Sequence, residues 1–271
     1  MHLPTQVTYP VAAVGDVHGQ RAFLERLLAK LRRLPEWPDL AVVFVGDYCD
    51  RGPDVRGTID LLLELLRDHP NWSAVLGNHD LAPTRAARLD GKPRSAYWIE
   101  RYRDRYDHEA TFQSYLGRAP DHARWEQELD ALREAMPAAH RDFLASLPWL
   151  VEAPGHLCLH CGLSPEVVLS PQEQVRALHE RRWERSFTRP GTRTEELWQP
   201  EYPVWVGADR FLSERPLAYP GKVQVSGHVQ VDRADVNEVR IRLDTSGGFH
   251  EPLTACLLRS ATAEPVLIPS N

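Results

Sequence analysis

The sequence predicts an α/β fold that begins with two consecutive βαβ units. Three apolar stretches alternate with two segments in which leucines recur at helical spacing. This alternation favours parallel strands joined by right-handed crossovers. A glycine-led polar turn follows each apolar stretch directly. Because ligands of parallel sheets bind beyond the carboxyl ends of the strands, the sequence predicts a functional site at this edge.

The elements of this first third follow one another in order. They are the strand Val11–Val14, the helix Arg21–Leu34, the strand Ala41–Val45, the helix Val55–His69 and the strand Trp72–Leu76. Each helix ends before a proline, which cannot donate a backbone hydrogen bond within a helix. The second strand is apolar throughout, as is typical of a strand covered on both faces.

The middle of the chain, roughly Leu81–Leu147, predicts a helical insertion. It is rich in Arg, Asp and Glu, and its aromatic residues Trp98, Tyr102 and Tyr106 are four residues apart. We interpret this stripe as the buried face of a helix rather than as a base-stacking platform. Because no Gly/Ser-rich linker interrupts the sequence, we expect residues 1–271 to form a single domain with this insertion.

The last part of the chain returns to short strands. The predicted elements are the strand Leu157–Leu159, the helix Pro171–Arg185, and the strands Val223–Val225, Val239–Leu243 and Leu253–Leu258. We expect the last two strands to be part of a meander that completes a second sheet.

Composition restricts the classes of partner. A net charge of -6 does not favour stable binding to nucleic acid or to an anionic membrane. No apolar run approaches the ~20 residues of a membrane span, and the start lacks the pattern of a signal peptide. Four cysteines are too few for a disulfide framework, so we expect a cytoplasmic location. The oligomeric state stays open.

Five predicted strands end in turns that carry polar, metal-ligating residue types. These residues are Asp16, His18, Asp47, Asn78, His79, His160 and His228. Carboxylate, imidazole and amide donors together suit Mn²⁺, Fe or Zn²⁺. Because they are too many for one tetrahedral site, two metal ions that share a bridging carboxylate are the simplest hypothesis.

The motifs resemble those of the calcineurin-like metallophosphoesterase superfamily. In order, they are GDVHG at 15–19, GDYCDRG at 46–52, GNHD at 77–80, His-x-Gly at 160–162 and GH at 227–228. The sequence is most similar to the phosphoprotein phosphatase (PPP) branch, including bacterial Ser/Thr protein phosphatases and symmetrical bis(5′-nucleosyl)-tetraphosphatases. The resemblance implies a four-layer α/β/β/α sandwich with the helical insertion added to it.

The resemblance also implies a set of ligands for two divalent metal ions, with Mn²⁺ the first choice and Fe or Zn²⁺ the alternatives. Asp16 and His18 would hold the first ion, Asp47 would bridge both, and Asn78, His160 and His228 would hold the second. The implied reaction is in-line attack on a phosphomonoester by a hydroxide that bridges the metals.

Three catalytic roles follow from the same resemblance. Arg51 would bind the substrate phosphate through its two-pronged guanidinium. His79 would protonate the leaving oxygen, and Asp50 would orient its ring.

Several further residues have open roles. Asp80 either steadies the metal site or only caps the following helix. Arg210 is a candidate second phosphate-binding arginine, and Asp244 and His250 are candidates for the surroundings of the metals. Cys158 and Cys161 form a C-x-x-C pattern, which we interpret as small buried residues because alternate strand side chains point to opposite faces.

Two substrate classes stay open, with the first favoured. The acidic Asp50 favours a bacterial Ser/Thr protein phosphatase, since the matching residue of the tetraphosphatases is usually not acidic. GNHDL at 77–81 favours a dinucleoside polyphosphate hydrolase, since protein phosphatases more often carry Glu after the His. The expected partner is therefore a phosphorylated protein, or a small phosphoester or dinucleotide. A non-catalytic metal-binding scaffold is disfavoured because no ligand of the motif set is missing.

The charges of the insertion bear on the same choice. Its basic side chains could embrace a polyphosphate, or they could pair with neighbouring acidic residues on a solvated face. The basic residues are Arg85, Arg88, Lys92, Arg94, Arg101, Arg103 and Arg105, and the acidic ones are Asp90, Glu100, Asp104 and Asp107.

Overall fold

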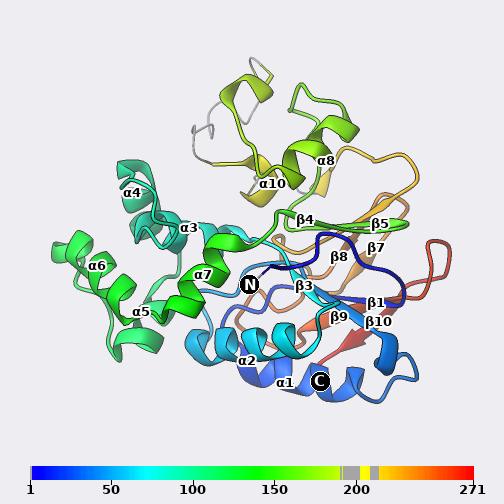
Figure 1. The fold of residues 1–271 in the computed structure, drawn as a ribbon, viewed down its shortest axis with the longest axis horizontal. Helices are drawn as coiled ribbons and strands as arrows, with labels where there is room; N and C mark the ends of the chain where they lie inside the picture. The colour runs from blue at the N-terminus through cyan, green and yellow to red at the C-terminus, as the bar shows by residue number, and fades with distance from the viewer. Residues whose placement is uncertain (1, 190, 192–201, 208–213) are drawn as a thin grey trace.

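Two five-stranded β-sheets lie face to face, with helices on both outer faces (Figure 1). The computed structural model describes residues 2–189, 191, 202–207 and 214–271. This arrangement confirms the four-layer α/β/β/α sandwich. In the described part of the chain, no helix combines the length and the apolar character needed to cross a bilayer.

The first sheet has the strand order β10-β9-β1-β2-β3. Its strands are β1 (Val11–Val14), β2 (Ala41–Phe44), β3 (Ser73–Ala74), β9 (Thr254–Leu258) and β10 (Val266–Pro269). As predicted, β1, β2 and β3 are parallel. The placement of Leu253–Leu258 in the second sheet was wrong, because β9 pairs antiparallel with β1. The crossovers place β2 on one side of β1, which leaves the other edge of β1 for this late strand.

The outer face of this sheet is covered by α1 (Arg21–Leu31) and α2 (Val55–Asp68). Alternate side chains of β1 separate the two faces: Ala12 and Val14 pack toward the helices, whereas Val11 and Ala13 join the core between the sheets. A single turn of 3-10 helix (Trp37–Asp39) leads from α1 into β2.

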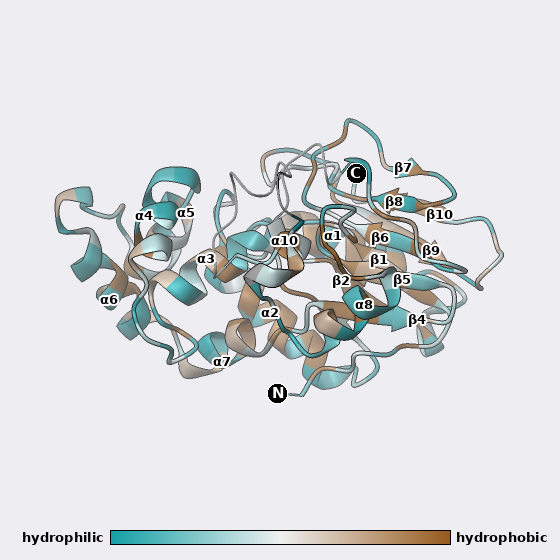
Figure 2. Cartoon of the chain, turned by 90° about the horizontal axis from the view of Figure 1, so that it is seen from above, coloured by the Kyte–Doolittle hydropathy of each residue, from teal (hydrophilic) through white to brown (hydrophobic). Residues whose placement is uncertain are grey.

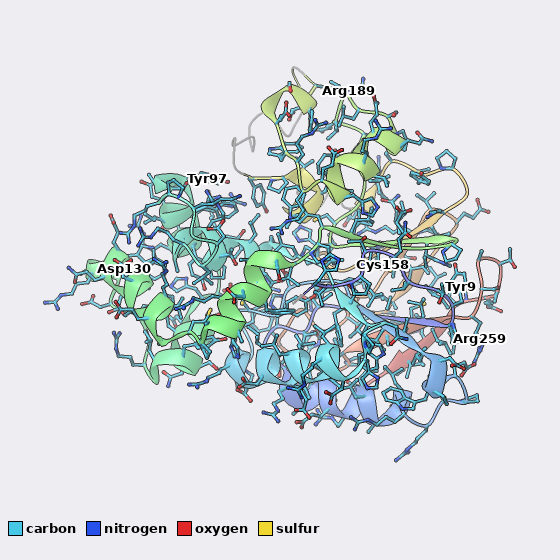
Figure 3. All side chains as sticks on the ribbon, viewed as in Figure 1. Tyr9, Tyr97, Asp130, Cys158, Arg189 and Arg259 are labelled. Atoms are coloured by element: carbon cyan, nitrogen blue, oxygen red, sulfur yellow. The ribbon has the colours of Figure 1, made fainter. Side chains whose placement is uncertain are left out.

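The second sheet has the strand order β4-β5-β6-β8-β7. Its strands are β4 (Leu150–Ala153), β5 (His156–Leu159), β6 (Val223–Ser226), β7 (Asp235–Val236) and β8 (Arg240–Arg242). The expected meander is wrong here as well, because β6 and β8 are parallel neighbours. Cys158, labelled in Figure 3, lies in the core between the two sheets.

Three short elements cover the outer face of the second sheet (Figure 1). They are α8 (Pro171–His179), the 3-10 turn Arg185–Phe187 and α10 (Val204–Gly207). The helix predicted to run to Arg185 therefore ends at His179. Its start is fixed by a capping box between Ser170 and Glu173.

The helical insertion extends to one side of the sandwich (Figure 1). Its helices are α3 (Asn78–Ala86), α4 (Ala96–Arg105), α5 (Glu109–Leu116), α6 (Trp125–Ala135) and α7 (Ala138–Ser146), with a 3-10 turn at His122–Arg124. In Figure 2 the central strands are mainly hydrophobic, whereas the outer helices of the insertion are largely hydrophilic. The aromatic stripe is buried as predicted, since Trp98, Tyr102 and Tyr106 all belong to the core.

Candidate metal centre and active site

The strand ends of the two sheets bring the predicted residues together. Asp16 and His18 follow β1, Asp47 follows β2, Asn78 starts α3 after β3, His160 follows β5 and His228 follows β6. Ligand atoms lie within 4.8 Å of one another in two groups, Asp16–Asp47–His160 and His18–Asp47–His79. Asp47 is the member that both groups share.

The Asp47 carboxylate lies at the centre of this arrangement. Its Oδ2 is 3.4 Å from Nε2 of His18 and 3.3 Å from Nε2 of His160. Burial alone would raise the pKa of Asp47, but the neighbouring imidazoles of His160 and His79 lower it well below its usual range. Asp47 therefore carries its negative charge between two imidazoles.

Backbone carbonyls set the orientation of both imidazoles. Nδ1 of His18 donates to the carbonyl of Cys49, and Nδ1 of His160 donates to that of Val45, each at 2.8 Å. These bonds turn the opposite nitrogen, Nε2, toward Asp47. Metal-ligating histidines are commonly oriented by such a bond from the second ring nitrogen.

Asn78 and His228 complete the second side of the cluster. The amide oxygen Oδ1 of Asn78 lies 2.8 Å from Nδ1 of His228 and 3.0 Å from Nε2 of His160. The backbone N–H of His228 donates to Oδ2 of Asp16 at 2.9 Å. These bonds join Asn78 and His228 to the group formed by Asp16, Asp47 and His160.

The cluster crowds buried carboxyl groups whose oxygens are not all satisfied by hydrogen bonds. Burial and the neighbouring Asp244 raise the pKa of Asp16. Burial would lower the pKa of His160, but Asp47 and Asp16 raise it to about 10. Oδ1 of Asp16 and Oδ2 of Asp244 are buried and have no hydrogen-bond partner among the described residues. Uncompensated carboxylate oxygens beside oriented imidazoles fit divalent cations, so the residues present suit the implied metal pair.

Several of the same residues have an unusual backbone conformation with a positive φ angle. Of the seven non-glycine residues with positive φ among those described, five belong to the predicted site: His18, Asp47, Asp50, Arg51 and His228. Such conformations are disfavoured for residues with a side chain and concentrate at functional sites.

Two of the glycines in the motifs are required by close contacts. A Cβ at position 77 would lie 2.0 Å from Oδ1 of Asp47, and one at position 227 would lie 1.7 Å from Oδ1 of Asp16. These contacts explain why glycine precedes Asn78 and His228.

The three predicted catalytic side chains contact one another. Nδ1 of His79 lies 2.8 Å from Oδ2 of the fully buried Asp50. The Arg51 guanidinium donates to Nε2 of His79 at 3.2 Å and to Nε2 of His18 at 3.1 Å. It also donates to the carbonyl of Gly247 at 2.9 Å, which holds it over the cluster.

Asp80 steadies the turn that carries Asp47. Its Oδ2 accepts the backbone N–H groups of Asp47 at 2.9 Å and Gly77 at 3.0 Å, and its Oδ1 accepts those of Tyr48 at 2.7 Å and Cys49 at 3.1 Å. Burial, followed by the Asp47 charge, raises the pKa of Asp80 to about 7. Of the two roles left open by the sequence, the geometry therefore supports the first.

The other candidates differ in position. Asp244 is buried beside Asp16, and its Oδ1 accepts the N–H of Gly247 at 2.8 Å. His250 is exposed and bonds Gln230 at 3.0 Å. Arg210 lies outside the described residues.

The two cysteines of the C-x-x-C pattern are buried, as are Cys49 and Cys256. The interpretation of Cys158 and Cys161 as small buried residues is thus confirmed.

Sequence reasoning missed four insertion residues that reach the site. Tyr102 and Thr111 bind Asp50, the Tyr106 ring contacts His79, and Asp107 pairs with Arg51. Tyr102 and Tyr106 belong to the predicted aromatic stripe, but spacing alone does not reveal what a buried hydroxyl binds.

The comparisons with known proteins agree with this geometry. Residues 9–232 match the family model of the calcineurin-like phosphoesterases. The catalytic subunit of serine/threonine-protein phosphatase 6 from Caenorhabditis elegans is 41% identical over 75 residues, which are 27% of this chain and 22% of that protein. The chain thus matches less than a quarter of the length of this curated relative.

Two solved structures are similar over nearly the whole chain. A protein assigned as a diadenosine tetraphosphatase is 22% identical, with a TM-score of 0.54 and 98% of each chain covered. A protein serine/threonine phosphatase from Saccharomyces cerevisiae is 15% identical, with a TM-score of 0.57 and coverage of 98% of this chain and 84% of that one. At these identities the likeness shows the shared fold.

Proposed function

Because the chain belongs to the calcineurin-like phosphoesterase family, whose members are metal-dependent hydrolases, we propose that it hydrolyses phosphomonoesters as a bacterial-type Ser/Thr protein phosphatase. One observation carries the proposal: Asp50, His79 and Arg51 form a hydrogen-bonded chain directly beside the cluster around Asp47.

In this proposal the cluster holds two divalent metal ions. Its ligands are Asp16, His18, Asp47, Asn78, His160 and His228, with Mn²⁺ the first choice and Fe or Zn²⁺ the alternatives. When bound, the ions would lower the pKa of a water molecule and neutralise charge on the phosphoryl oxygens. The uncompensated oxygen of Asp16 supports this ligand set.

The protein's own groups supply substrate binding and proton transfer. Arg51 presents two guanidinium nitrogens on the side of the cluster, which suits a phosphate oxygen pair. Nε2 of His79 lies within 3.2 Å of that guanidinium, so a phosphate bound by Arg51 places its leaving oxygen within reach of this nitrogen. Asp50 holds the opposite nitrogen and stabilises the ring when Nε2 carries the proton.

Two observations support a phosphoprotein rather than a dinucleotide as the substrate. The acidic Asp50 bonds His79 directly. Insertion arginines also have acidic partners, since Arg85 pairs with Asp90 at 2.8 Å and Arg103 with Asp104 at 2.8 Å. Arg94 pairs with Glu126 and Asp130, the latter labelled at the outer end of the insertion in Figure 3. The Arg94 and Arg103 pairs fit the solvated-face interpretation, whereas the Arg85–Asp90 pair is largely buried.

One observation favours the second candidate, a dinucleoside polyphosphate hydrolase. Phe249 is 61% exposed, and the guanidinium carbon of Arg51 lies 5.3 Å from its ring centroid. An exposed aromatic ring beside a phosphate-binding arginine can stack a nucleobase.

The proposal also includes the cellular setting and the domain organisation. The reduced cysteines support a cytoplasmic location. Contacts between the insertion and Asp50 support residues 1–271 acting as one domain.

The experiment is a hydrolysis assay with added Mn²⁺ that compares a phosphoserine/phosphothreonine peptide, p-nitrophenyl phosphate and diadenosine tetraphosphate. We expect the highest kcat/KM with the peptide. Preference for diadenosine tetraphosphate, with two ADP released, would establish the second candidate instead. No turnover with Mn²⁺, Fe²⁺ or Zn²⁺ would contradict both and favour a non-catalytic scaffold.

A further inference from the structure

The Asp50 carboxylate is held by two hydroxyl groups that come from the insertion. Its Oδ1 accepts from Oγ1 of Thr111 at 2.6 Å and from the hydroxyl of Tyr102 at 3.0 Å. Its Oδ2 meets Nδ1 of His79 at 2.8 Å. Both oxygens of a fully buried carboxylate therefore have partners, and only His79 among these partners belongs to the motifs identified in the sequence.

The direction of the hydrogen bond between Thr111 and Asp50 follows from the donors and acceptors available. The backbone N–H of Asp50 donates to Oγ1 of Thr111 at 2.9 Å, so this oxygen is an acceptor there. Its single proton is then directed to Oδ1 of the same residue. Thr111 thus binds both the backbone and the side chain of Asp50, whose φ of 68° is disfavoured for a residue with a side chain.

Both hydroxyl groups are carried by rigid elements. Tyr102 on α4 and Thr111 on α5 are fully buried. The Tyr102 ring packs against Phe112, Trp125 and His108, at centroid distances of 6.4, 5.9 and 5.4 Å. This packing leaves the Tyr102 hydroxyl little freedom to leave Asp50.

The turn between α4 and α5 contacts the other two catalytic side chains. The Tyr106 ring packs edge-on against His79 with centroids 4.8 Å apart. The backbone N–H of Arg51 donates to the carbonyl of Asp107 at 3.2 Å, and Nε of Arg51 donates to the Asp107 carboxylate at 3.2 Å. One short segment of the insertion therefore contacts Asp50, His79 and Arg51 together.

We propose that Tyr102 and Thr111 are positioning residues for phosphoester hydrolysis: they fix the Asp50 carboxylate so that the His79 ring presents Nε2 to the leaving oxygen. This inference rests on the proposed function of His79. It assigns the insertion a share in catalysis that neither its charge nor its aromatic spacing indicates.

The first test compares leaving groups. Tyr102→Phe and Thr111→Val each remove one hydroxyl group with little change in shape. Proton donation matters for phenyl phosphate and hardly for p-nitrophenyl phosphate, whose oxygen leaves as a stable anion. We expect kcat with phenyl phosphate to fall roughly 10-fold or more in each variant, against less than about 2-fold with p-nitrophenyl phosphate, as general acids contribute about 10²–10⁴-fold.

Two further variants separate positioning from loss of structure. Thr111→Ser restores the hydroxyl and should recover phenyl phosphate hydrolysis. Tyr115→Phe is the matched control, because Tyr115 is a buried tyrosine on α5 whose hydroxyl bonds His140 at 2.8 Å. It should leave both rates unchanged. Equal losses with both substrates in Tyr102→Phe and Thr111→Val, or no rescue by Thr111→Ser, would overturn the proposal.

A second test does not depend on activity. The proton on Nδ1 of His79, bonded to Asp50, should give a downfield ¹H NMR signal in the metal-free protein, assigned by its loss in His79→Gln. We expect this signal to shift or broaden in the double variant Tyr102→Phe/Thr111→Val and to persist in Tyr115→Phe. An unchanged signal in the double variant would refute the positioning role. An inactive wild-type protein with the expected spectra would instead contradict only the proposed function.

Discussion

Oδ2 of Asp80 accepts the backbone N–H of Asp47 at 2.9 Å, so one buried carboxylate holds the peptide of the residue that both candidate ligand groups share. Replacing Asp80 with Ala leaves four buried N–H groups without this acceptor. We expect a loss of at least about 2 kcal/mol in the free energy of unfolding, measured with urea.

The control for this variant is Asp104→Ala, because Asp104 is exposed and pairs with Arg103 at the surface. Its effect on the free energy of unfolding should be much smaller than that of Asp80→Ala, because exposed ion pairs contribute little to stability. Similar losses in the two variants would show that the Asp80 bonds contribute no special stability.

Replacing Asp47 with Asn removes the charge shared by both ligand groups. We expect metal content, measured by elemental analysis, to fall below that of the wild type. We also expect kcat/KM to fall more than about 100-fold. Replacing even a residue that only hydrogen-bonds a metal ligand lowers metal affinity or activity about 10–100-fold. Asp130→Asn at the far end of the insertion should change neither. Normal metal content and activity in Asp47→Asn would remove the basis of the two-metal assignment.

Replacing Arg51 with Ala removes the guanidinium that lies between His18 and His79. Hydrogen bonds between charged groups contribute about 1.5–3 kcal/mol, so inhibition by vanadate should weaken roughly 10- to 100-fold. Arg21→Ala, which breaks only the surface pair with Glu25, should leave inhibition unchanged. Equal inhibition of Arg51→Ala and the wild type would exclude Arg51 from phosphate binding.

Replacing His79 with Ala tests the proposed proton donor. The loss of kcat should be large with phenyl phosphate or a phosphoserine peptide and small with p-nitrophenyl phosphate. Steady-state kinetics with the three substrates measure this difference. A loss of the same size on all three would assign His79 to binding or structure rather than to proton transfer.

The buried His156 predicts a dependence of stability on pH. The Tyr9 hydroxyl accepts the N–H of Gly155 at 2.9 Å and so donates to Nδ1 of His156 at 2.6 Å. Burial, aided by the charge of Lys222, lowers the pKa of His156 to about 4. The unfolded chain, with a His pKa of about 6.5, therefore binds more protons between these values, and stability falls as the pH falls through this window.

We expect this single residue to lower the free energy of unfolding by about 3 kcal/mol as the pH falls from 6.5 to 4. Urea unfolding across this range should show a shallower pH dependence in His156→Gln, which keeps an acceptor for the Tyr9 hydroxyl. Parallel pH curves for the two proteins would contradict the lowered pKa.

Local patterns were sufficient to predict the strands around the cluster and the turns that carry it. Asp16, Asp47 and Asn78 could be placed together because each follows a parallel strand, and such strands end at one edge of a sheet. The sheet partner of β9 could not be predicted, because five consecutive buried apolar residues fit either sheet equally well. The choice between the two sheets depends on where a strand edge is left unpaired, and β9 pairs with the edge of β1 that β2 does not occupy.

The contacts of the insertion are the other part that the sequence does not reveal. Of the acidic residues that the sequence offered as partners for the insertion arginines, Asp90 and Asp104 do pair with one, whereas Asp107 pairs with Arg51. The bond between Thr111 and Asp50 joins residues 61 positions apart. Hydroxyl groups carry no periodic signal, so their partners depend on how whole helices pack.

The antiparallel pairing of β9 with β1 affects how the protein is made on the ribosome. One edge of β1 can pair with β2 early in synthesis, but its other edge has no strand to pair with until residues 254–258 have left the exit tunnel. Until then the nascent chain exposes an apolar strand edge, the kind of surface that promotes aggregation. Completion of the first sheet therefore waits until β9 has been synthesised, long after its partner β1.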